Sequence, residues 1–138
     1  MSERATLSKL FKENLLSFLK ILQEYVSDSK DLYEAENAIE VGLIPIVTII
    51  DNISRKLNEE GVADEKKVNV MEKIKNRDET FFLDDKTNFF ASLNSKGKAL
   101  EFKALWQDPS FTQQNKDAIW EWVEILTEIV HSYKLATN

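Results

Sequence analysis

The chain has 138 residues, a length at which one domain can bury its own core without disulfides or metal ions. Apolar residues make up 43% and charged residues 30%, which excludes a disordered chain, and three Gly and two Pro are too few for the many turns of a β-sandwich or barrel. The net charge of −6 weighs against general binding to nucleic-acid phosphates, and the lack of Cys excludes disulfides and thiolate metal sites.

The first predicted element is a long amphipathic helix over residues 6–27. Its apolar residues recur at spacings of three and four, as a helix with one buried face requires. They are Leu7, Leu10, Phe11, Leu15, Phe18, Ile21, Leu22, Tyr25 and Val26. The residues before this helix lack the apolar run of a signal peptide, and no apolar stretch reaches the roughly 20 residues that span a bilayer. We therefore expect neither signal-directed export nor a membrane span.

A second helix is predicted from about Lys30, and Gly42 and Pro45 interrupt it. The interruption predicts either a kink in one long helix or a short break before the next one. Residues 41–50, VGLIPIVTII, form the most apolar stretch of the chain. We expect them to enter the central core helix, which would end near Gly61; a groove that receives a helix, or a membrane-active hairpin, is the alternative.

Residues 64–76 predict a shorter helix with Val68, Met71 and Ile74 facing inward. Between residues 64 and 103 the chain carries nine Lys and Arg against eight Asp and Glu, whereas the segments on either side have an acidic excess. A basic segment can bind nucleic acid, but here acidic side chains are interspersed. A solvated helix face is therefore the favoured interpretation.

The Phe-rich stretch TFFLDDKTNFF, residues 80–90, is expected to anchor the connection to the following helices. A short helix should end at Trp106. After a turn at residues 108–110, a last helix should begin near residue 111 to 113, capped by Ser110 or Thr112, and run to about Leu135.

The last predicted helix carries two tryptophans two positions apart. At about 100° per residue, Trp122 falls in the main apolar arc of this helix, which spans roughly 120°. Trp120 lies about 120° from the centre of that arc. The helical wheel therefore predicts Trp122 in the core and Trp120 at its margin, where the helix meets a second neighbour or a partner.

Four carboxylates of the same helix, Asp117, Glu121, Glu124 and Glu128, lie within about 60° of one another and repel. They form either a solvated ridge or a surface that faces cations, supplied by the Lys-rich segment 66–77 or by a partner. The candidate partner-binding residues are therefore Trp120 and these four carboxylates.

No motif points to catalysis. His131, the only His, is expected to be exposed near a helix end, and the single Glu128-x-x-His131 spacing is one copy of a pattern that di-iron bundles need twice. Acidic pairs such as Asp84-Asp85 are common by chance in so acidic a chain. We predict no enzyme, no cofactor, no metal ion and no small-molecule substrate.

Two segments within residues 72–130 carry a pattern of mostly hydrophobic anchor residues. These are Arg77-Asp78-Glu79, Phe81-Phe82, Leu105-Trp106, Asn115-Lys116, Ile119-Trp120 and Trp122. This pattern resembles one found in small helical proteins of nucleocytoplasmic large DNA viruses. The resemblance implies a viral protein that acts inside an infected eukaryotic cell or in the virion. It also implies that Trp120 is a packing anchor between the last two helices, and it brings no catalytic residue with it.

Together these patterns predict an all-α fold, a compact bundle of about six helices in a single domain over residues 1–138. The first, third and last helices should carry the core. We expect an intracellular, non-enzymatic interaction or structural module that binds a protein partner or a second copy of itself. The alternatives are a nucleic-acid-associated accessory protein using the Lys-rich segment 66–103, and a viral helix-groove protein that resembles cell-death inhibitors.

Overall fold

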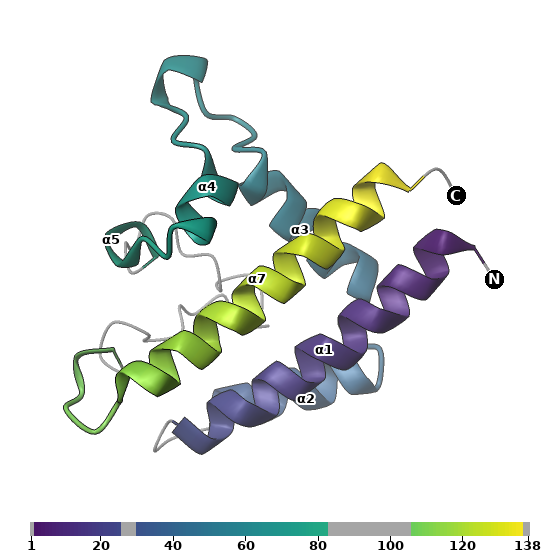
Figure 1. Cartoon of the computed structure of the whole chain (residues 1–138). Coiled ribbons are helices and arrows are strands. Elements are labelled where there is room, and N and C mark those ends of the chain that lie inside the picture. Colours follow the sequence, from purple (N-terminus) through teal and green to yellow (C-terminus); the bar gives the residue numbers. More distant parts are fainter. Residues whose placement is uncertain (1, 26–29, 83–105, 137–138) are drawn as a thin grey trace.

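The computed structural model describes residues 2–25, 30–82 and 106–136. Across these ranges the chain forms six α-helices, one short 3-10 helix and no strand, so the predicted all-α class is confirmed (Figure 1). The elements in chain order are α1 (Glu3–Tyr25), α2 (Lys30–Glu40), α3 (Ile46–Leu57), η1 (Asp64–Lys66), α4 (Val70–Lys75), α5 (Glu79–Phe82) and α7 (Gln113–Leu135).

The two 23-residue helices, α1 and α7, lie side by side and form the centre of the fold (Figure 1). Helix α2 packs on α1, while α3 and α4 pack on α7. The buried side chains come mainly from α1, α3 and α7, as predicted. They include Phe11, Leu15, Phe18, Leu19 and Leu22 of α1, Ile49, Ile50 and Ile53 of α3, and Ile119, Trp120, Val123, Leu126 and Val130 of α7. Removal of this apolar surface from water is the main force that stabilises the bundle.

A short break separates α2 from α3, which decides between the two predicted alternatives. Gly42 adopts a left-handed conformation with φ +83°, and Pro45 is the N-cap of α3. The chain therefore leaves α2 and starts again in a new direction. The prediction that residues 41–50 lie in the core is wrong for Val41 and Leu43 on this connection and for Val47 in α3, which are exposed. It is right for Ile49 and Ile50, which are buried.

The predicted helix over residues 64–76 is also partly wrong. Helix α4 begins only at Val70, and Val68, expected inside, is 46% exposed while Val70 is buried. The cause is a set of local side-chain bonds that compete with helix formation. The Glu59 carboxylate accepts hydrogen bonds from the backbone N–H groups of Val68 and Asn69, at 2.9 and 3.2 Å, and the Asn69 side chain caps α4.

Helix α4 ends in a turn that sets the direction of Arg77. The N–H of Asp78 donates to the carbonyl of Lys73, and the N–H of Arg77 donates to that of Ile74, both at 3.0 Å. This pair of bonds places Arg77 in the left-handed region, with φ 51°, where glycine is usual. A side chain with a Cβ costs about 1 kcal/mol there, so another contact must offset the strain.

Helix α7 begins where one of the two predicted caps placed it. The Thr112 side chain accepts a hydrogen bond from the N–H of Asn115 at 3.2 Å, whereas the N–H and hydroxyl of Ser110 both donate to Asp108. The Phe-rich stretch after Phe82 and the predicted short helix before Trp106 lie outside the described residues. No helix in the described part of the chain is long and apolar enough to cross a bilayer.

Candidate functional site

The two tryptophans of α7 have the reverse of their predicted positions. Trp120 is 2% exposed, while Trp122 is half-buried and stacks on Phe18 of α1 with ring centroids 6.0 Å apart. The helical wheel predicted a second neighbour or a partner beside Trp120, and the structure shows that α7 is covered by α1 and also by α3 and α4 of the same chain. Trp120 is therefore a packing residue of the chain itself, and its proposed place in a partner-binding surface is corrected.

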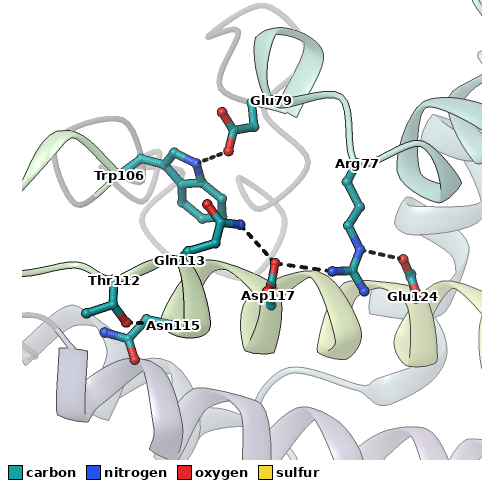
Figure 2. Close-up of polar contacts among 8 residues, drawn as sticks. All are labelled: Arg77, Glu79, Trp106, Thr112, Gln113, Asn115, Asp117 and Glu124. Atoms are coloured by element: carbon teal, nitrogen blue, oxygen red, sulfur yellow. Dashed lines mark hydrogen bonds and ion pairs between the residues drawn. The ribbon is translucent and has the colours of Figure 1, made fainter.

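An aromatic cluster joins Trp120 to the start of α7. The Trp106 ring meets Trp120 edge to face, with centroids 6.2 Å apart, and Phe111 at 5.6 Å, while Tyr25 packs on Phe111 at 5.4 Å. The Trp106 indole Nε1 donates a hydrogen bond of 2.8 Å to Glu79 (Figure 2). These contacts hold together the ends of α1, α5 and α7. The sequence predicted that Trp106 ends a helix and is one of the anchors of the resemblance, but nothing local shows which distant rings it meets.

A second link between α7 and the α4–α5 segment is ionic. The Arg77 Nη1 lies 3.3 Å from Asp117 Oδ1, and the Arg77 Nε lies 3.3 Å from Glu124 Oε1 (Figure 2). We call these three residues the Arg77 bridge. Gln113 also donates to Asp117 at 2.9 Å. Asp117 and Glu124 are two helical turns apart, so one guanidinium reaches both only because Arg77 projects over the middle of that span.

The predicted acidic ridge is thus divided by its neighbours. For Asp117 and Glu124 the facing cation belongs to the same chain. Glu121 and Glu128 are exposed, and neither forms an ion pair with any described residue. Between them on the same line of α7 stands Ile125, which is 44% exposed. This line continues through Ser132 and Leu135, also exposed, and we call Glu121, Ile125, Glu128, Ser132 and Leu135 the outer strip.

The Lys-rich segment is less basic in the structure than its composition suggests. Lys67 pairs with Asp64 at 3.1 Å and Lys73 with Asp78 at 3.3 Å, in addition to the Arg77 bridge. Three of the five cations between residues 66 and 77 are therefore paired with carboxylates. Pairing reduces the positive field that nucleic-acid binding needs. The part of the predicted segment beyond Phe82 lies outside the described residues.

The shifted pKa values have three local causes, which are hydrogen bonds at the start of α5, hydrogen bonds in the turn before α7, and burial. The Asp78 carboxylate accepts a hydrogen bond from the N–H of Phe81 and another from Lys73, and these contacts hold the pKa of Asp78 below its ordinary value of 3.8. Bonds from Ser110 lower the pKa of Asp108 in the same way, and partial burial lowers the pKa of Lys56. Each shift has a structural cause, so none of them by itself indicates acid–base chemistry.

His131 is exposed on α7, as predicted. The described side chains include no group of three or more His, Cys, Asp or Glu that could hold a metal ion. Comparison of the chain with models of protein families, with curated proteins and with solved structures finds no match. The function must therefore be inferred from this geometry.

Proposed function

We propose that the protein is a non-enzymatic protein-binding module and that the outer strip of α7 is its contact surface. The observation that supports this most is the exposure of two large aliphatic side chains on a helix that otherwise buries its apolar residues. Ile125 is 44% and Leu135 69% exposed. Burial of such side chains against a partner is favourable, and the exposed carboxylates beside them would form the polar rim.

The scaffold around the strip is suited to binding. Helix α7 is fixed by α1, by Trp120 in the core and by the Arg77 bridge. A surface on a rigid helix loses little conformational entropy when a partner binds. The backbone that carries the strip is thus fixed before contact, which favours a role in binding over a role as a flexible tail.

The viral resemblance would place such a contact in an infected cell or a virion, but it assigns no partner. Of the two alternatives, nucleic-acid binding is less favoured because most of the cations between residues 66 and 77 are paired. Binding of helical peptides in a groove stays a prediction.

Site-specific photocrosslinking in the full chain tests the proposal. A photoreactive amino acid replaces Ile125 in one variant and Glu13, exposed on α1, in a second. Both variants are incubated with lysates of eukaryotic cells and irradiated, and the crosslinked products are identified by mass spectrometry. We expect a reproducible crosslinked protein from position 125 that does not form from position 13.

Two matched charge reversals serve as competitors of that crosslink. The chain with Glu121→Lys and Glu128→Lys should fail to compete for the partner, while the chain with Glu13→Lys and Glu24→Lys, which changes the net charge equally on α1, should compete like the original. If position 125 yields no specific product, or if both reversals compete equally well, the outer strip is not the contact surface.

A further inference from the structure

The chemistry of the outer strip narrows the kind of partner. We infer that it binds a cationic amphipathic α-helix of another protein, in which an aliphatic side chain lies between Lys or Arg residues seven positions apart. This inference rests on the proposed function, because it names the partner of the same surface. It has three supports, which are charge, spacing and the poor fit of a second copy.

The charge of the strip is of one sign because the cations of α7 point elsewhere. Lys116 lies over the Trp106 ring, 5.8 Å from its centroid, and Lys134 bonds to Asp51 of α3. Glu121 and Glu128 are left facing solvent with Ile125 between them. A partner that covers Ile125 must bring cations to these carboxylates, since anions or apolar groups there would leave them buried and unpaired.

The spacing of the strip matches a helix better than a strand. Its five positions alternate steps of four and three residues, which is the repeat by which two helices pack at a shallow angle. Glu121 and Glu128 are seven residues apart, or about 10.5 Å along the axis. Two cations seven positions apart on a partner helix have the same separation. On one face of an extended strand, side chains recur every 6.6 Å or so, which reaches only one of the two carboxylates at a time.

A second copy of this chain is a poor occupant. The net charge of −6 opposes association of two copies, and two outer strips would place carboxylate against carboxylate. On the helices that the structure describes, no exposed face carries an aliphatic side chain between cations seven positions apart. The charge of the molecule as a whole therefore favours a basic partner that differs from it.

Titration with designed peptides tests the inference. The probe is a fluorescein-labelled peptide of about three heptads, with Leu along one face and Lys flanking it at positions seven apart. Its acidic twin has Glu at every such Lys. We expect fluorescence anisotropy to show that the full chain binds the cationic peptide, more weakly as the salt concentration rises, and does not bind the twin.

Charge reversal supplies the decisive control. Glu121→Lys with Glu128→Lys should lower the affinity for the cationic peptide by about tenfold or more and should create binding to the acidic twin, whereas Glu13→Lys with Glu24→Lys should leave both affinities unchanged. Circular dichroism and thermal melting of each variant check that it is folded. If the cationic peptide does not bind, or binds the reversed chain equally well, the inference is overturned.

The two hypotheses fail in different ways. A specific crosslink from position 125 to a second copy of the chain, or to a protein segment that is not a cationic helix, overturns the inference and leaves the proposed function standing. The absence of any specific crosslink at position 125 overturns the proposed function itself.

Discussion

Two neighbouring faces of α7 each carry a pair of carboxylates, but one pair is bonded to another part of the chain and the other is exposed to solvent. Asp117 and Glu124 are bonded to Arg77 in the Arg77 bridge (Figure 2). Glu121 and Glu128, in the outer strip, are exposed to solvent. On the helical wheel the two pairs differ by only about 40°. The comparison teaches that the role of a charged residue on a helix depends on which neighbour reaches its side of the helix, and that a small rotation changes this role.

The largest effect is expected where the covered side of α7 enters the core. Trp120→Ala should lower the free energy of unfolding by about 3–5 kcal/mol, because it removes a fully buried ring from contact with Trp106. Trp122→Ala should cost clearly less, since Trp122 is only half-buried. Chemical denaturation of the two variants measures the difference. Equal losses of unfolding free energy in the two variants would show that Trp120 is no more closely packed than Trp122.

The next effect concerns the two carboxylate pairs directly. Asp117→Lys with Glu124→Lys should destabilise the chain by about 1–2 kcal/mol, because two ion pairs become repulsions around Arg77. Glu121→Lys with Glu128→Lys should leave stability unchanged or raise it by a few tenths of a kcal/mol, since it relieves like-charge repulsion along the helix. Both variants have the same net charge. Similar melting temperatures for the two double variants would contradict the division of the four carboxylates into a bridged pair and an exposed pair.

Two substitutions of Arg77 distinguish the effect of its ion pairs from the effect of its left-handed backbone conformation. Arg77→Ala should destabilise by about 1 kcal/mol, because it loses two half-exposed ion pairs and keeps the left-handed conformation. Arg77→Gly loses the same pairs but relieves the strain, so its stability should lie closer to that of the original chain. Urea denaturation distinguishes them. If Gly is no more stable than Ala at this position, the left-handed strain is not a significant term.

The smallest effect is a pH dependence beside the Arg77 bridge. Because the folded-state pKa of Asp78 is lowered, its contribution to stability is complete above the ordinary value of 3.8 and is lost as the pH falls through the folded-state pKa. Asp78→Asn keeps a hydrogen-bond acceptor for the N–H of Phe81 but cannot titrate. Its stability should therefore fall less steeply than that of the original chain as the pH drops below 3.8. Parallel slopes in a pH series of denaturation curves would exclude this role.

Much of the helical layout was determined by the sequence itself. The apolar periodicity predicted α1 and α7 closely, Gly42 and Pro45 marked the break between α2 and α3, and Thr112 was one of two predicted caps. These features depend on residues a few positions apart, so local propensity and capping are enough to predict them. Where local side-chain bonds competed with the helix, as Glu59 does at Val68 and Asn69, periodicity placed the start of α4 too early.

The tertiary structure alone decided which side of α7 is covered. The bonds from Arg77 to Asp117 and Glu124 join residues 40 and 47 positions apart, and the bond from Trp106 to Glu79 spans 27. A helical wheel gives the direction of each side chain and can indicate a second neighbour, but it does not show which segment of the chain lies on each side of the helix. That is why Trp120 is buried, why two of the four carboxylates pair with Arg77, and why the outer strip is left exposed. Each depends on long-range packing, which the sequence pattern of one helix does not contain.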